Sequence, residues 1–218
     1  MKHFLSFYLG GQKVFVLPNP IIVRQYDHPE DIPRQRLLVT YLGAILPEKG
    51  VFDLVKAFQR VIKRQPTAKL SIFGNKQLDL LRTIIQEASL QNHIEVNAWL
   101  SKRDLIKQIK TTGLLVLPSY SEGIPSILLE AMASKTPILT TKVGGIPEIL
   151  TEASATFSDP GDIEDLAGKI LFCLDHPNLL AQKAAIAYDS VLQYDLKTIA
   201  AKWLCIILEV YDNEHSSR

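Results

Sequence analysis

The sequence has little of what marks the specialised classes of protein. Its 218 residues include two cysteines, Cys173 and Cys205, and no apolar run approaches the ~20 residues that a membrane-spanning helix needs. Lysine and arginine (24) nearly balance aspartate and glutamate (23), so no excess of basic charge favours nucleic acid. We expect both cysteines to be buried free thiols, as suits a cytoplasmic protein.

Common catalytic sets are also missing. The five histidines are scattered rather than paired at metal-ligand spacing, and no Ser/His/Asp or Cys/His set has a recognisable spacing. No G-x-G-x-x-G follows the first regular strand, which argues against a nicotinamide dehydrogenase. No Asp-x-Asp lies at a strand end. We therefore expect neither a bound metal nor a cofactor. The apolar start of the chain lacks the small-residue cleavage site of a signal peptide.

Short apolar runs bounded by glycine and proline recur from residue 37 onward. Runs this short are typical of strands that are buried on both faces. The predicted strands cover residues 37–42, 70–73, 94–99, 114–117, 138–141 and, more weakly, 155–157, with one earlier strand at 13–17.

Helical patterns fill the gaps between these runs, because apolar residues recur there at spacings of three and four. They predict helices over residues 51–62, 80–85, 105–109 and 127–132, and then three consecutive helices over 162–175, 178–193 and 195–212. Strands that alternate with helices predict a Rossmann-like, doubly wound α/β domain with a parallel sheet. We place this domain at residues 37–218, after a proline-punctuated lead-in over residues 1–36.

Ligands of such sheets bind beyond the carboxyl ends of the strands. That rule directs attention to the loops 43–50, 118–126 and 142–147.

The strongest local signal is the second of these loops. A predicted strand ends there, Glu122-Gly123 form a turn, and a helix is predicted to begin near Ile124-Pro125 with proline in its first turn. Free backbone N–H groups at that helix start would favour an anion such as a diphosphate, and Gly123 would let a ligand approach the backbone. Glu130 lies in an apolar stretch of the helix, where a carboxylate needs a partner. The alternative is that Glu130 only pairs locally and that Glu122 is a solvated loop residue.

The other two loops carry weaker signals of the same kind. Lys49 is predicted to stand at the N-terminus of the first helix, where a phosphate would be welcome; the alternative is an exposed loop lysine. Gly144-Gly145 again form a glycine turn before a helix start, for which plain helix capping is the alternative.

Taken together, these segments resemble the retaining glycosyltransferases of family 4, which have the GT-B architecture. The segment from Glu122 to Ala133 resembles that family's E-x(7)-E motif. Tyr41-Leu42-Gly43 with Pro47-Glu48-Lys49-Gly50 resembles its first donor-domain loop, and Gly144-Gly145-Ile146-Pro147-Glu148 resembles the loop that follows. Val16-Leu17-Pro18-Asn19 is similar to its interdomain linker.

The resemblance implies a fold and roles for individual residues. The fold would be the C-terminal, nucleotide-sugar-binding half of a GT-B enzyme, with residues 1–36 a remnant of the N-terminal domain and linker. Lys49 would bind the donor diphosphate, Glu130 the ribose hydroxyls, and Glu122 would lie at the donor sugar near the reacting carbon. The remaining donor-site residues implied are the amides of Gly123 and Ile124, with Gly43 and Ser126, and Gly74, Trp99 and Leu100 near the base.

Two departures from the family pattern stand out. Ala44 occupies the position where the family usually has an arginine on the diphosphate, and the acceptor-binding N-terminal domain is absent. The main hypothesis is a glycosyltransferase donor domain that works with an acceptor half supplied elsewhere, for a glycan or lipid-linked acceptor, in the cytoplasm or at the membrane periphery. The alternative is a non-catalytic partner subunit with a degenerate donor site. A receiver-like domain is disfavoured, because no acidic cluster closes the first strand.

Overall fold

The computed structural model of the chain describes residues 6–9, 12–15, 18–26 and 33–215. Its body is a six-stranded sheet in the order β5-β4-β3-β6-β7-β8, and every neighbouring pair is parallel. The strands are β3 (Gln35–Leu42), β4 (Lys69–Gly74), β5 (Ile94–Ala98), β6 (Thr112–Leu117), β7 (Ile138–Thr141) and β8 (Thr156–Ser158). The predicted doubly wound α/β fold is confirmed, and strand ends differ from the prediction by one or two residues.

A separate two-stranded antiparallel hairpin precedes the body, formed by β1 (Ser6–Leu9) and β2 (Gln12–Phe15). The strand predicted at 13–17 overlaps β2, and its residues Val16 and Leu17 lie outside the described residues, as do His3 and His28.

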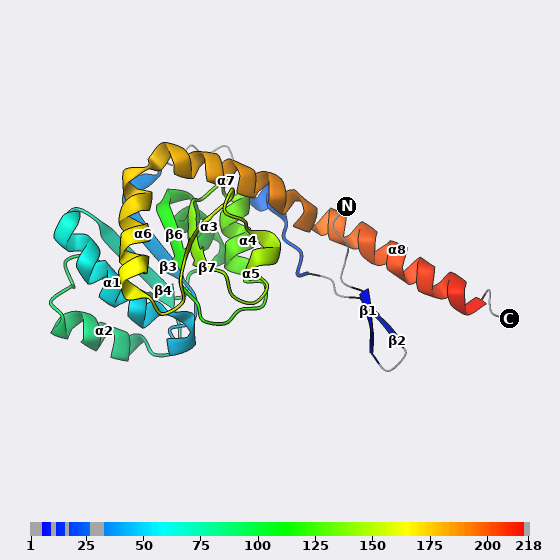
Figure 1. The fold of residues 1–218 in the computed structure, drawn as a ribbon, viewed down its shortest axis with the longest axis horizontal. Helices are drawn as coiled ribbons and strands as arrows, with labels where there is room; N and C mark the ends of the chain where they lie inside the picture. The colour runs from blue at the N-terminus through cyan, green and yellow to red at the C-terminus, as the bar shows by residue number, and fades with distance from the viewer. Residues whose placement is uncertain (1–5, 10–11, 16–17, 27–32, 216–218) are drawn as a thin grey trace.

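The helices of the body follow the strands in the expected alternation (Figure 1). They are α1 (Val51–Arg64), α2 (Leu78–Glu87), α3 (Lys102–Thr111), α4 (Ser126–Ala133), α5 (Ile146–Ile149), α6 (Ile163–Asp175) and α7 (Pro177–Val191). In α1 the buried, apolar side includes Leu54, Phe58 and Val61. The helix after β6 begins at Ser126 rather than near Ile124, and Pro125 occupies its N-cap position.

The order of the strands reverses at β3 and β6. From β3 the chain moves through α1 to β4, on one side, whereas from β6 it moves through α4 to β7, on the other. Right-handed crossovers in opposite directions put α1 and α4 on opposite faces of the sheet. The carboxyl ends of β3 and β6 therefore flank the switch point, which is where open α/β sheets bind their ligands.

Residues before β3 are tied into this body. Ile21, Val23 and Tyr26 are buried in the core, the last at 2% exposure, and Ile21 exchanges backbone hydrogen bonds with Tyr194 and Leu196. The boundary at residue 36 stays a prediction, but the segment 21–26 packs as part of the domain.

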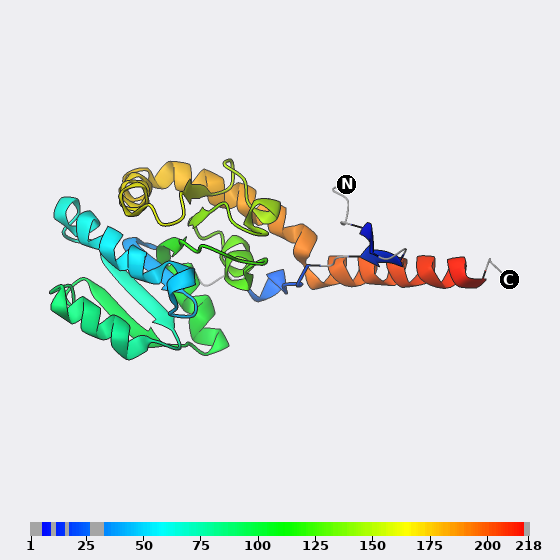
Figure 2. The ribbon, with the colours of Figure 1, turned by 60° about the horizontal axis from the view of Figure 1, so that its bottom comes forward.

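The last helix, α8 (Leu196–His215), runs out from the body along its long axis (Figures 1 and 2). Within the described part of the chain, no helix combines the length and apolarity needed to cross a bilayer. Cys205 lies on α8 and is exposed, so the prediction that both cysteines are buried is wrong for it; Cys173 in α6 is buried, and both are free thiols. The outer half of α8 projects from the body (Figures 1 and 2).

Candidate functional site

The candidate site lies along the edge formed by the carboxyl ends of the strands. Because all six strands are parallel, their following loops meet at this one edge. From β5 to β7 the edge carries, in spatial order, Trp99 and Leu100, Gly74, the loop of Gly43 and Lys49, the loop of Glu122 and Gly123, and Gly144-Gly145. The three loops singled out in the sequence thus share one edge.

Lys49 and Glu122 meet at the switch point. Lys49 sits in a short 3-10 turn directly before α1, and its Nζ lies 2.9 Å from Oε1 of Glu122. The buried Ser119 hydroxyl donates to the same carboxylate at 2.7 Å. The two side chains are 26% and 11% exposed, so the alternatives of a free loop lysine and a solvated Glu122 are both wrong. A cation and a carboxylate are held in fixed positions in the crevice.

The loop after β7 packs against the backbone of Glu122 and Gly123. Gly144 has φ +52°, and a Cβ there would lie 1.7 Å from the carbonyl oxygen of Glu122. Gly145 donates its N–H to the carbonyl of Gly123 at 3.0 Å. Only a glycine can adopt this φ and approach this closely without strain. Gly144-Gly145 therefore shape the turn that presents Glu122, which goes beyond plain helix capping.

Gly123 itself faces open space. A Cβ added there would meet nothing within 4 Å, unlike one at Gly145. Three residues later, α4 begins without a side-chain cap, so N–H groups of its first turn have no side-chain acceptor. Ile124 is half-buried and Ser126 is exposed at the helix start. This arrangement leaves room for an anionic group at the backbone.

Glu130 is held by a second cation. Oε1 of Glu130 lies 2.6 Å from Nζ of Lys102, the first residue of α3, and the Glu130 side chain is 14% exposed. Lys102 also donates to the hydroxyl of Tyr26. Burial, followed by the charge of Glu130 and a hydrogen bond to it, raises the pKa of Tyr26, so this phenol stays protonated. Glu130, a carboxylate in an apolar helix, thus has its partner in Lys102 of α3.

The remaining predicted residues divide into two groups. Trp99 is 49% exposed and Leu100 half-buried at the end of β5, so both are available to a ligand. Gly43 and Gly74 allow close packing that a side chain would prevent. A Cβ at Gly74 would lie 2.3 Å from the carbonyl oxygen of Gly43, and a Cβ at Gly43 would lie 2.8 Å from the hydroxyl of Tyr41. These glycines let the loops after β3 and β4 pack together.

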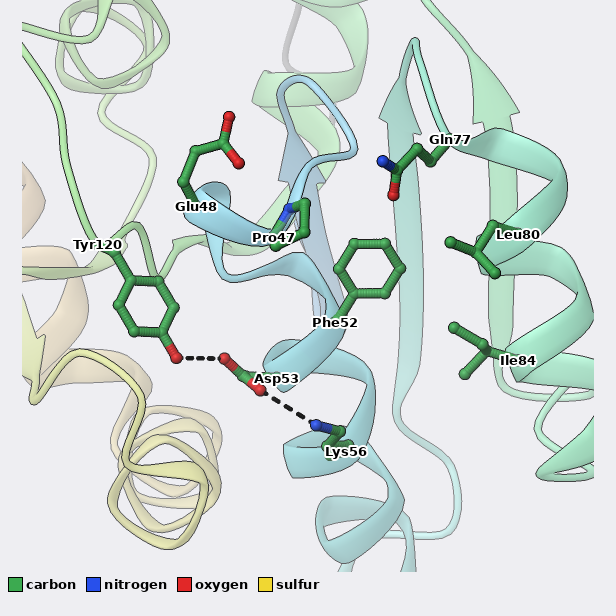
Figure 3. A pocket seen from close by; sticks show the side chains of 9 residues that line it. All are labelled: Pro47, Glu48, Phe52, Asp53, Lys56, Gln77, Leu80, Ile84 and Tyr120. Atoms are coloured by element: carbon green, nitrogen blue, oxygen red, sulfur yellow. Dashed lines mark hydrogen bonds and ion pairs between the residues drawn. The ribbon is translucent and has the colours of Figure 1, made fainter.

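A groove of about 610 Å³ adjoins the site between α1 and α2 (Figure 3). The Tyr120 hydroxyl donates to Asp53 at 2.6 Å, and the Tyr120 N–H donates to the carbonyl of Glu48 at 2.9 Å. The hydrogen bond to Asp53, more than burial, raises the pKa of Tyr120. These two bonds tie the loop after β6 to the start of α1 and keep Glu122 opposite Lys49. The groove is lined by Pro47, Glu48, Phe52, Asp53, Lys56, Gln77, Leu80, Ile84 and Tyr120.

Sequence reasoning missed Lys102, Tyr26 and Ser119. One signal for Lys102 was available: a lysine in the first turn opposes the helix dipole, which favours acidic residues there. A residue placed against its local preference often has a role elsewhere. Nothing local marked Tyr26 or Ser119.

Comparison with known proteins gives the family of the chain. Residues 23–189 match the family described as glycosyl transferases group 1. The chain belongs to this family.

The group 1 relatives are about twice as long as the chain. Glycogen synthase of Mycobacterium tuberculosis is 28% identical over 195 residues, which cover 88% of this chain and 47% of that protein. The phosphatidylinositol N-acetylglucosaminyltransferase gpi3 subunit of Schizosaccharomyces pombe is 26% identical, with coverages of 77% and 38%. The chain thus spans less than half the length of these relatives.

Solved structures place the match in the C-terminal half of the group 1 fold. The C-terminal domain of a group 1 protein, LpcC from Francisella tularensis, aligns over 83% of this chain and 96% of its own, with a TM-score of 0.66 and 23% identity. Anabaena HepE, solved in complex with UDP and glucose, aligns with a TM-score of 0.79 and 20% identity over 88% of this chain and 56% of its own. At these identities the likeness establishes the fold.

Proposed function

We propose that the chain binds a nucleoside-diphosphate sugar in the crevice between β3 and β6. The observation that carries this is the meeting of Lys49 and Glu122 at 2.9 Å, beside the uncapped start of α4 and the open space at Gly123. Lys49 and the amides of Gly123 and Ile124 supply positive charge for a diphosphate. Glu122 lies at the sugar and Glu130 at the ribose.

The intact enzyme would transfer the sugar to a glycan or lipid-linked acceptor with retention of configuration. An acceptor half, on the same polypeptide or on another chain, would complete the site; the relatives are about twice this length. It would act in the cytoplasm or at the membrane periphery.

The chemistry available to this half is positioning and charge stabilisation. Cleavage of the bond between sugar and diphosphate puts negative charge on the leaving oxygen, and a cation fixed in advance stabilises that charge without reorganisation. Lys49 is already oriented by Glu122 and by the Ser121 carbonyl. The Glu122 carboxylate can stabilise positive charge that develops at the sugar carbon.

The test is calorimetric titration of the 218-residue chain with UDP, GDP and ADP, beside a Glu130→Ala variant. We expect saturable binding of one nucleotide and a loss of about tenfold or more on substitution, because a hydrogen bond to a charged group contributes roughly 1.5–3 kcal/mol. Binding of none of the three by the folded chain would contradict the proposal.

A second candidate function is a non-catalytic partner subunit, and Ala44 is the observation that favours it. The Ala44 carbonyl accepts from the Tyr41 hydroxyl at 2.7 Å, so the backbone is fixed while no cation projects from this position. In a working site Ala44→Arg should improve nucleotide affinity about tenfold by adding a charge-assisted contact. Ala44→Met, of similar length without charge, is the control; equal affinities for the two variants would favour the vestigial function.

An assay of sugar transfer tests whether the chain needs a separate acceptor half. Because the chain spans less than half the length of its relatives, the 218 residues alone should transfer no sugar from the nucleotide donor that they bind, measured with radiolabelled donor and simple acceptors. Turnover by the isolated chain would contradict the two-half proposal.

A further inference from the structure

Lys102 links Glu130 to Tyr26. Its ammonium donates to Oε1 of Glu130 at 2.6 Å and to the hydroxyl of Tyr26. Tyr26 is 2% exposed and cannot swing away without opening the core. The three groups come from three separate parts of the chain: the segment before β3, the start of α3 and the middle of α4.

The Glu130 carboxylate keeps acceptor sites beyond its contact with Lys102. An ionised carboxylate has about four lone-pair sites. Lys102 uses one, which leaves about three that can accept hydrogen bonds. Two adjacent hydroxyls of a ribose ring supply two donors for these sites.

The contact with Lys102 also orients the carboxylate. The ammonium is itself held by the hydroxyl of the buried Tyr26. Without Lys102, the Glu130 side chain, 14% exposed in a largely apolar helix, would lose its charged partner. The half-exposed Lys102 is thus part of the site as well as of the surface.

We propose that Lys102, held by Tyr26, positions the Glu130 carboxylate to accept from both ribose hydroxyls, so that the site selects ribonucleotides over 2′-deoxyribonucleotides. This inference rests on the proposed donor site and assigns its sugar specificity to a residue outside the E-x(7)-E segment. Lys102 and Tyr26 are positioning residues; Glu130 makes the contact with the ligand.

The experiment compares UDP, GDP and ADP with their 2′-deoxy counterparts by calorimetry on the full chain. Wild type should bind the preferred ribonucleotide about tenfold more tightly than its deoxy form, the effect of one lost hydrogen bond to a charged group. Lys102→Met should reduce that ratio to about twofold or less, Tyr26→Phe should reduce it in part, and Lys102→Arg, which keeps the cation, should restore most of it.

Arg60→Met is the matched control, since Arg60 and Glu164 form an ion pair of the same 2.6 Å length between α1 and α6. It should leave the ratio unchanged, and thermal unfolding would establish that every variant is folded. A ratio that stays at the wild-type value in Lys102→Met would overturn the positioning role while leaving the donor site intact. Wild type that binds no nucleotide would overturn the proposed function and, with it, this inference.

Discussion

At Gly123 the missing side chain leaves a space that a ligand can use. A Cβ there would contact nothing within 4 Å, so Gly123→Ala should fold normally while placing a methyl group where the proposed donor would approach the backbone. We expect nucleotide affinity to fall by about tenfold, in line with the roughly 1–3 kcal/mol that an extra methyl group costs in a filled space.

Gly168 supplies the control for this prediction. It also has open space around its Cα, but it lies within α6. Gly168→Ala should raise the free energy of unfolding by up to about 1 kcal/mol through helix propensity and leave nucleotide binding unchanged. If the two alanine variants bind nucleotide with equal affinity, Gly123 does not contact the ligand.

The two thiols should differ in reactivity. Burial raises the pKa of Cys173 to about 11, so at pH 8 only about one thiol in a thousand is the reactive thiolate. Cys205 is exposed on α8. Titration with Ellman's reagent at pH 8 should show one fast thiol in the native protein and two after unfolding; two fast native thiols would contradict the burial of Cys173.

At the scale of the elements, Arg34 joins the ends of two helices. Its guanidinium donates to the carbonyls of Ile109, Lys110, Thr112 and Ser134 and to the hydroxyl of Thr136. Burial lowers its pKa to about 10, which still leaves it charged at neutral pH, as suits the negative ends of α3 and α4.

Arg34→Met should therefore lower the free energy of unfolding by about 1–2 kcal/mol, because several helix-end carbonyls lose their donor. Chemical denaturation would measure this change. Arg82→Met, which removes contacts to Asp79 and to one carbonyl, should cost less than half as much; a comparable loss would show that Arg34 has no special part at the helix ends.

The elements themselves were predictable because their signal is local. Short apolar runs ended by Gly43, Gly74 and Pro118 gave the strands, and spacings of three and four gave α1 to α4. The Ser101 cap of α3 is equally local: its hydroxyl accepts from the N–H of Asp104, three residues further on.

The pairings across the site were not predictable, since they join residues far apart in sequence. Lys49 meets Glu122, and Lys102 meets Glu130, only because the strand order brings their loops together. The resemblance placed Lys49, Glu122 and Glu130 at one site but gave no sign of Lys102, whose position carries no motif. Tyr26 is further still from the helices it contacts.

For the whole molecule, the outstanding surface feature is the projecting part of α8. Trp203, Leu204, Ile207, Leu208 and Tyr211 are each 51–58% exposed. Exposed apolar side chains gathered on one element favour association. Sedimentation velocity should show concentration-dependent self-association of the chain, and Leu204→Lys with Ile207→Lys should abolish it. The same double substitution should barely change the thermal midpoint; monomeric wild type at high concentration would contradict the prediction.

The reversal of strand order at β3 has a consequence for how the chain acquires its structure. Val39 pairs with Leu70 on one side, after a single helical crossover, and with Leu114 on the other, after the chain has passed through two more strands and helices. Contacts that close long loops form late and slowly, so the β3–β4–β5 half should assemble before β6 joins it. The crevice lies between the half that assembles early and the half that assembles late. A nucleotide bound there would therefore stabilise the folded state in which the two halves are joined.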